Sequence, residues 1–423
     1  MTEKTLSSLP HYFGLPGGAA KAYFVCQKYL NNNQNAVFIT AADTEDFDNG
    51  ALEFAPRGAE ILHFPETDTG RMHSLFTLLS PAKGPRLLSA NYESLSAPLP
   101  SPEQFKKQLF VLHRGDVIRR QALLDLLEKN GYSREDYAEA PGQYGARGSV
   151  VDIFCLNRQE PLRLYFSGNR IDSVSAFDLD TQNTKEHVDQ AVIIPLHFEE
   201  LPSTLADYLP DYTYLLDEPA PTFDFSSLKE PEIITLLPSH GATNCNLKGN
   251  IPFGANMDLL AREIQSLKQQ GLQITICCLN RGELDRLTEL LADRKELAHV
   301  EFKISPLTQG FINPQDRFAL ITSNEILNRR YTTSSILKRF DIENAKRVRF
   351  KELQEGDYVV HQEYGIGRYL GLEVMNRTEK PTDCLMIEYR RGSRLYVPMY
   401  DFKKVQKYIS AGGKRPHTVC IGG

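Results

Sequence analysis

Short apolar runs and helical stretches alternate over the first 105 residues. The runs at 36–40, 61–64 and 87–89 contain β-branched and aromatic residues, which is typical of buried strands. A helical stretch at 19–30 precedes the first run and stops at the asparagine turn 31–33. Because helices and strands alternate in this way in proteins with a parallel sheet, the pattern predicts an α/β domain.

A different pattern begins after a segment rich in proline and serine at 95–102. A helix with a broad leucine face at 123–127 is predicted to stop at 130–131, an Asn-Gly pair, since glycine adopts the left-handed conformation that ends helices. The segments 162–166 and 173–177 then alternate between apolar and polar residues. This pattern predicts a small α+β insert built mainly from antiparallel strands.

The α/β pattern returns at 256–340, whereas nearly every predicted element from 356 to 409 is a short strand. About five short strands in roughly 55 residues favour a small closed barrel, since closure removes exposed sheet edges. The sequence therefore predicts an α/β multidomain protein. Its parts are an α/β domain in two pieces (1–105 and 196–250), an α+β insert (106–195), a small α/β domain (251–345), a small all-β barrel (350–410) and a linker (411–423).

Composition narrows the class of protein. The 423 residues carry a net charge of −6, which disfavours a protein that binds nucleic acid through a globally basic surface. No apolar run approaches the roughly 18 residues of a membrane span, and the first residues lack the pattern of a signal peptide. The seven cysteines include no C-x-x-C pair, and the ten histidines form no metal-binding motif. We therefore expect a cytoplasmic protein without a metal, a cofactor or disulfide bonds.

The segment 14–22 precedes a predicted helix and has some features of a phosphate-binding loop. A working loop needs a second glycine, a lysine and a hydroxyl residue at fixed spacing. Ala19, Ala20 and Lys21 stand at these three positions, so each requirement fails. We interpret the segment as a structural turn at the start of a helix, with residual anion binding by the helix N-terminus as the lesser alternative.

Two acids, Asp217 and Glu218, follow an apolar strand at 214–216. In nucleotide hydrolases an acid at the end of such a strand holds magnesium. Together with Gly14, Gly17 and Lys21 they define a degenerate nucleotide site, which we expect to be inactive. We therefore assign no catalytic residue to this chain.

The run 365–371 has the glycine content of a dinucleotide-binding fingerprint. Its last glycine stands one position late, and a strand pattern rather than a helix follows it. We interpret the run as a glycine hairpin turn.

Residues of the insert are candidates for protein recognition. Arg147 and Arg163 occur near aromatic residues that include Phe166. Arginine and aromatic residues are enriched in binding hot spots. The alternative is that the arginines pack their aliphatic stems over neighbouring strands.

A second candidate set, Leu372, Val374 and Met375, follows a strand of the C-terminal part. If that strand is the edge of a sheet, it invites pairing with a strand of another chain. If it is not, the same residues face the core of the barrel.

Two parts of the chain resemble known domains. The segments 357–361, 363–369 and 395–398 are similar to the CarD-like RNA-polymerase-interacting domain. The motifs at 142–148 and 177–182 resemble the UvrA-binding domain, which the Mfd family of bacterial transcription-repair coupling factors shares with the excinuclease subunit UvrB. The resemblance implies a UvrB-like, degenerate helicase-type α/β domain that carries the insert, then a small α/β domain, then a Tudor- or CarD-like barrel.

The same resemblance implies partners and their contact residues. The barrel would bind the β subunit of RNA polymerase by strand addition, and the insert would bind UvrA. DNA would be reached only through a motor outside this chain, no membrane would be involved, and the protein would be a monomer. The implied polymerase contacts are Leu372, Val374 and Met375, and the implied UvrA contacts are Arg147, Arg163 and Phe166.

The chain departs from the family at two places. Ser167 and Arg170 stand where the family usually has a second phenylalanine and an acidic run, which is expected to weaken UvrA binding by about 1–3 kcal/mol. The ATP-dependent translocase that follows the linker in the family has no counterpart here, so the chain is expected to be a fragment or a motorless relative. The leading hypothesis is a non-enzymatic scaffold that couples transcription to repair. The alternatives are a nucleotide-dependent DNA-processing enzyme and a stand-alone CarD-like transcription regulator.

Overall fold

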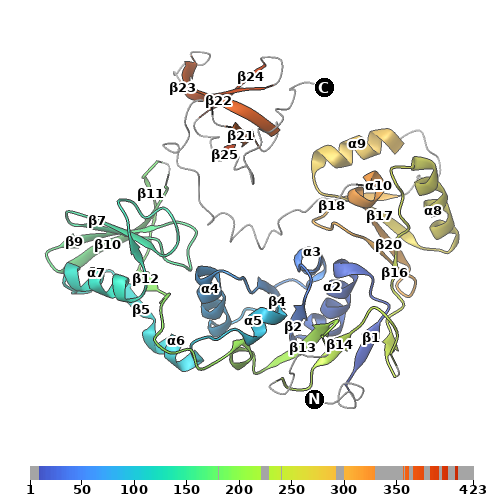
Figure 1. Ribbon diagram of the computed structural model, residues 1–423, viewed down its shortest axis with the longest axis horizontal. Helices are drawn as coiled ribbons and strands as arrows, with labels where there is room; N and C mark the ends of the chain where they lie inside the picture. Colours follow the sequence, from blue (N-terminus) through green and yellow to red (C-terminus); the bar gives the residue numbers. More distant parts are fainter. Residues whose placement is uncertain are drawn as a thin grey trace. The chain divides into compact units, whose positions relative to one another are not determined.

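The computed structural model forms two compact units, residues 1–341 and 342–423, and each unit is described by itself (Figure 1). The described residues are 9–179, 181–220, 228–239, 241–291 and 300–328 of the first unit, and 356, 358–361, 365–375, 382–389, 393–398 and 405–407 of the second.

The first sheet has seven strands, all paired in parallel, and draws on the two sequence pieces that flank the insert. In spatial order its strands are β15 (Thr243–Asn244), β1 (His11–Phe13), β14 (Glu232–Ile234), β13 (Tyr212–Asp217), β2 (Asn35–Thr40), β4 (Arg86–Asn91) and β3 (Glu60–His63). The helices between these strands and before the insert are α2 (Gly17–Lys28), α3 (Glu45–Phe54), α4 (Asp68–Leu79), α5 (Tyr92–Ser96) and α6 (Pro102–Gln108). The prediction of a parallel sheet is confirmed.

Helices cover both faces of this sheet. Successive residues of a strand point to opposite sides, so one strand contributes to both cores. Ala36 and Phe38 of β2 pack into a core with α2 and α3, whereas Val37 and Ile39 pack into a core with α4. Phe38 stacks on Phe47 of α3, with ring centroids 3.8 Å apart. Burial on both sides explains why β2 is a continuous apolar run in the sequence.

The insert forms a second sheet of six strands, which are antiparallel except for the pair β6–β7. In spatial order these are β11 (Thr184–His187), β10 (Arg170–Phe177), β9 (Leu162–Ser167), β8 (Val150–Ile153), β7 (Gln143–Arg147) and β6 (Ser133–Arg134). Helix α7 (Arg120–Lys129) contributes Leu123, Leu124 and Leu127 to the core of the insert. A separate antiparallel pair joins β5 (Phe110–His113) to β12 (Gln190–Ile193).

The two segments that connect the insert to the first sheet lie side by side. Leu99, before the insert, and Ser203, after it, exchange two backbone hydrogen bonds of 2.8 and 3.0 Å. The hydroxyl of Tyr208, in the 3₁₀ helix Leu205–Tyr208, donates to the carbonyl of Pro100 at 2.8 Å. The chain therefore leaves the first domain and returns to it at neighbouring points.

The third sheet has five strands and mixes parallel with antiparallel pairs. In spatial order the strands are β16 (Lys248–Gly249), β19 (Phe311–Asn313), β20 (Phe318–Thr322), β17 (Gln273–Cys278) and β18 (Glu301–Ile304), and the helices are α8 (Met257–Gln269), α9 (Arg281–Leu291) and α10 (Ser323–Leu327). Leu260, Ile264 and Leu267 of α8 are buried, as their helical spacing predicts.

The second unit contains one antiparallel sheet. Its strands, in spatial order, are β24 (Arg394–Pro398), β23 (Thr382–Glu388), β22 (Gly365–Met375), β21 (Tyr358–His361) and β25 (Val405–Lys407). Val359, Leu385 and Ile387 are fully buried at its centre. Among the described residues no pair joins the outer strands β24 and β25, so the closed barrel stays a prediction.

The glycine run at 365–371 belongs to strand β22 and is not the hairpin turn that the sequence suggested. Gly365 and Gly367 pair with β21. A Cβ on Gly367 would overlap Ile387 Cγ2 and lie 3.1 Å from both Glu388 O and Tyr389 Cζ, so close packing favours glycine there. Gly371 has a φ of +118° and follows a break in register after Tyr369, which is the conformation of a β-bulge.

Candidate functional site

The degenerate nucleotide site lies where a strand passes into a helix. Gly14 lies between β1 and α2, and Gly17 is the first residue of α2; their φ angles are +71° and +72°, which favour glycine. Lys21 lies one turn into α2 and Asp217 ends β13. The structure thus brings the predicted residues of this site together, although Lys21 and Asp217 are 196 positions apart in the sequence.

The polar groups of this site bind one another. Lys21 Nζ donates to Asp217 Oδ1 at 2.6 Å, and Thr40 Oγ1 donates to Asp217 Oδ2 at 3.0 Å. Glu218 has a φ of +45°, and its side chain accepts a hydrogen bond from the backbone N–H of Leu236. The lysine and the buried acid of this degenerate site therefore neutralise each other.

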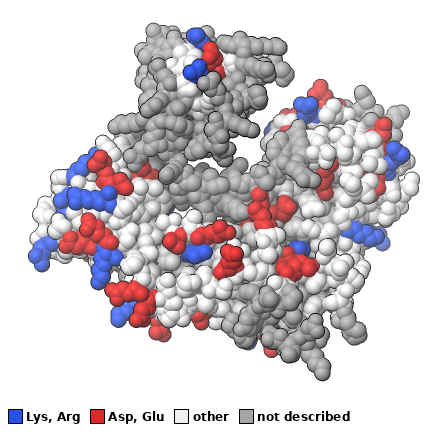
Figure 2. Space-filling model, viewed as in Figure 1, with Lys and Arg blue, Asp and Glu red and all other residues white. Residues whose placement is uncertain are grey.

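One face of the first domain is mainly acidic. On the face seen in Figure 2, acidic side chains gather over this domain with few basic ones among them. Negative charge repels phosphate groups and nucleic acid. The ion pair between Lys21 and Asp217 agrees with the expectation that this site is inactive, which stays a prediction.

The candidate surface of the insert is built around a buried acid. Asp152 on β8 is only 2% exposed, and its carboxylate accepts hydrogen bonds from Arg163 Nε at 2.7 Å and from Arg163 Nη2 at 2.9 Å. The guanidinium of Arg163 also lies 4.1 Å from the ring centroid of Phe177. The hydrogen bonds with Asp152 raise the pKa of Arg163, so this side chain stays cationic and fixed in place.

A second arginine extends from the same acid to the surface. Arg147 Nη2 lies 3.4 Å from Asp152 Oδ2, and its guanidinium lies 4.3 Å from the ring centroid of Tyr137. The side chain of Arg147 is half exposed. Both arginines line a shallow depression of about 410 Å³, together with Tyr137, Val150, Tyr165 and Gln182.

Phe166, predicted as a third contact, lies elsewhere. It is 7% exposed and belongs to the hydrophobic core, whereas its neighbour Tyr165 is 40% exposed. Alternation along β9 accounts for this difference, since Arg163 and Tyr165 share one face and Phe166 points to the other. The aromatic residue at the depression is therefore Tyr165, and the spacing along the strand would have identified it.

The candidate residues of the second unit lie in the distal half of β22. Leu372, Val374 and Met375 pair with Leu385, Asp383 and Thr382 of β23. Strand β21 pairs only with positions 365–368 of β22. Among the described residues, the segment 371–375 thus has a strand partner on one side only.

Other chemistry finds no support in the described part of the chain. No group of three metal-ligating side chains occurs there, and no helix is long and apolar enough to cross a membrane. Burial raises the pKa of the Cys26 and Cys155 thiols to about 12, so both stay protonated at neutral pH and act as apolar core residues. Cys420 lies outside the described residues.

Two family models match this chain. The UvrB interaction domain matches residues 110–198, which contain the depression with Arg147 and Arg163. The CarD-like/TRCF RID domain matches residues 353–409, which contain strand β22. The chain thus matches the model of the UvrB interaction domain and, further along, that of the CarD-like/TRCF RID domain.

The relatives that this chain matches are named transcription-repair-coupling factors. The one from Bacillus subtilis (strain 168) is 25% identical over an alignment 444 positions long, which covers 77% of this chain and 38% of the relative. The one from Staphylococcus aureus (strain bovine RF122 / ET3-1) is 22% identical over an alignment 538 positions long, which covers 96% of this chain and 46% of the relative. The chain is therefore homologous to transcription-repair-coupling factors over most of its length, and it spans less than half the length of these relatives.

Proposed function

We propose that this chain is a recognition scaffold that couples transcription to DNA repair. Its insert binds UvrA through the depression around Arg147 and Arg163, and its C-terminal sheet binds the β subunit of RNA polymerase. The observation that carries this proposal is the presence, in one chain, of both matched domains, each with an available surface. We assign no ATP-driven step to this chain, because Lys21 and Asp217 neutralise each other.

The depression suits a protein partner rather than a small molecule. It is shallow, and Arg147 rests on Tyr137 with its guanidinium half exposed. Flat surfaces with arginine and tyrosine are typical of binding hot spots, since both side chains bury large areas and keep polar ends for hydrogen bonds. Tyr165 supplies an exposed aromatic ring on the strand where the family has a phenylalanine at position 167.

The UvrA contact is tested with Arg147→Glu in the full chain. The variant reverses a charge at the depression, and we expect it to weaken binding of purified UvrA at least about tenfold. Binding is measured by biolayer interferometry at fixed salt. The matched control is Lys129→Glu, the same charge change at an exposed position of α7 outside the depression. Equal binding by Arg147→Glu and the control would remove the depression from the proposal.

The polymerase contact rests on the side of segment 371–375 that has no strand partner among the described residues. A strand of another protein can add to such an edge by backbone hydrogen bonds, and a charged side chain at the edge opposes this pairing. We therefore expect Met375→Arg to weaken binding of the isolated N-terminal lobe of the polymerase β subunit about tenfold or more, whereas Met375→Leu keeps binding. Binding by Met375→Arg as tight as by Met375→Leu would contradict strand addition here.

A further inference from the structure

The loop and the first turn of α2 are enclosed by other segments of the chain. A Cβ on Gly14 would overlap Asn244 Oδ1, and a Cβ on Gly17 would lie 2.8 Å from Gln309 Cδ. A Cβ on Gly18 would lie 2.7 Å from Asp46 Cβ. In a phosphate-binding loop these glycines let the backbone approach the ligand. Here the glycines have no side chains, so Asn244, Gln309 and Asp46 can pack directly against the backbone of the loop and of the first turn of α2.

Gln309 belongs to the small α/β domain, and residues next to it in the sequence also bind the first domain. Thr308 Oγ1 donates a hydrogen bond to Asp46 Oδ1. Ser305 Oγ donates to Glu53 Oε2 at 2.8 Å, and Lys303 Nζ forms an ion pair with the other oxygen of Glu53. Segment 303–309 thus runs along the N-terminal end of α2 and the length of α3.

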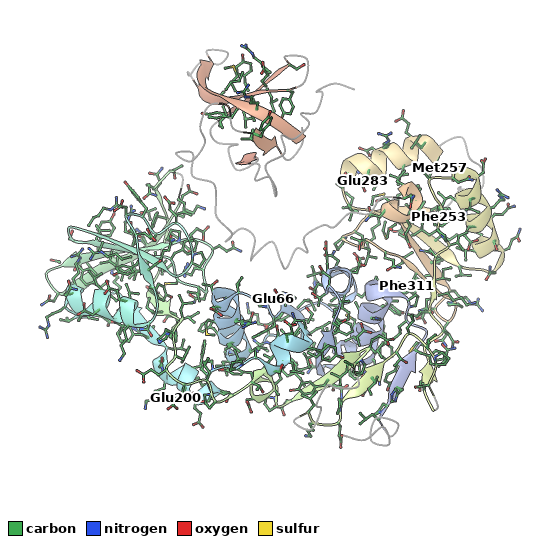
Figure 3. All side chains as sticks on the ribbon, in the orientation of Figure 1. Glu66, Glu200, Phe253, Met257, Glu283 and Phe311 are labelled. Atoms are coloured by element: carbon green, nitrogen blue, oxygen red, sulfur yellow. The ribbon has the colours of Figure 1, made fainter. Side chains whose placement is uncertain are left out.

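An aromatic cluster extends this contact into a shared core. Tyr23 of α2 lies 5.4 Å from Phe311 and 5.5 Å from Phe318, and it lies 5.3 Å from Phe54 of α3, measured between ring centroids. Tyr23 OH also donates to Asp316 Oδ2 at 2.6 Å. Figure 3 labels Phe311 where the third sheet meets α2 and α3. Phe311 is fully buried in one core cluster with α2 and α3 residues.

We propose that the small α/β domain is a built-in occupant of the nucleotide-type position of the first domain. Its Gln309 occupies the space beside Gly17 at the N-terminus of α2, and its aromatic residues share one hydrophobic core with α2 and α3. A domain that is driven by a nucleotide has to open and close around its ligand. Here another segment of the chain packs against the loop before α2, and the first domain shares a hydrophobic core with the small α/β domain. The role of the small domain is thus to hold the first domain in a fixed, nucleotide-independent state, whether or not UvrA or polymerase binds.

The proposal predicts that the two α/β domains unfold together. Hydrogen exchange of the full chain is followed by mass spectrometry over a urea series, with peptides from α2 and β20 as reporters. In the wild type, both peptides are expected to lose protection at the same urea concentration. Clearly separate midpoints would overturn the proposal, because a shared core requires joint unfolding.

A charge swap tests the contact itself. Glu53→Lys places two cations together, and we expect it to lower both midpoints in parallel. The double variant Glu53→Lys/Lys303→Glu restores the pair and is expected to recover most of the loss. Glu289→Lys, at an exposed position of α9, is the control for the charge change. A Glu53→Lys variant that behaves like this control would overturn the proposal, and so would a failure of the swap to rescue it.

The filled loop is tested with MgATP at millimolar concentration. No change in either midpoint of the wild type is expected, because the chain already occupies the site. A stabilisation by MgATP would overturn the proposal. None of these readouts involves UvrA or polymerase, so their outcome is independent of the binding tests above.

Discussion

Two regions of this molecule use the same ion-pair chemistry to opposite ends. At the loop of the first domain, one lysine meets one buried acid, Asp217, and Thr40 occupies the second oxygen. At the insert, one buried acid, Asp152, holds Arg163 by two hydrogen bonds and also approaches Arg147. In the first region one cation is paired with one acid, whereas in the second one acid is approached by two cations.

The difference shows that a buried acid does not by itself indicate whether a site has charged groups left to bind a ligand. A matched pair leaves no charge for a ligand, and surrounding segments can then pack against it. An acid shared by two arginines fixes one of them as a support, while the second stays at the surface with its donors available. Whether such a site can still bind a ligand depends on the number of cations around the acid and on whether other segments of the chain cover them.

The largest effect on stability is expected for Asp152→Asn. Arg163, whose side chain is 15% exposed, loses its carboxylate partner, and the free energy of unfolding should fall by about 2–3 kcal/mol. Urea denaturation measures this change. Arg147→Ala removes the half-exposed cation instead and should cost less than about 1 kcal/mol. Similar losses in the two variants would break the distinction between supporting and presented arginine.

The next effect is expected at the closed pair. Lys21→Met leaves Asp217, whose side chain is 7% exposed, without its cation and should lower the free energy of unfolding by about 2 kcal/mol. In the double variant Lys21→Met/Asp217→Asn the charge is gone as well, so the combined loss should be smaller than the sum of the two single losses. Additive losses would mean that the two side chains act independently.

The smallest effect concerns the pH dependence of Asp46, which lies beside the loop. Burial, with a further contribution from Asp43, raises the pKa of Asp46 above its ordinary value of 3.8. The folded state therefore holds the proton more tightly than the unfolded state, and this group makes folding less favourable as pH rises from about 3.8 through the raised pKa.

Asp46→Asn removes this titration but keeps an oxygen that can accept from Thr308. We expect the variant to gain stability relative to the wild type as pH rises from 3.5 to 7. Parallel stability curves over that range, measured by urea denaturation, would show that Asp46 does not titrate differently in the folded state.

Local patterns of the sequence predicted many of the helices and strands. The runs that became β2 and β4, the leucine face of α7 and the helix face of α8 all had the spacing of their final elements. Such patterns report which side chains need burial, and burial dominates the choice of element.

The candidate sites were predicted less completely, because they depend on long-range neighbours. No local pattern pairs Lys21 with Asp217, and none places Gln309 against Gly17. Asp152 was missed for the same reason, since an acid inside a strand reveals nothing about the arginine on the next strand. Phe166 was different, because strand alternation alone would have assigned its exposed place to Tyr165.

The hydrogen-bonded pair Leu99 and Ser203 has a consequence for how such a molecule can be assembled. The insert begins and ends at adjacent backbone positions of the first domain. A short link between these two residues would therefore replace the insert without moving the strands of the first domain. A recognition module of this kind can be gained, exchanged or lost in one genetic step. The parallel sheet would then stay the same, while the insert, and with it the binding partner, could change.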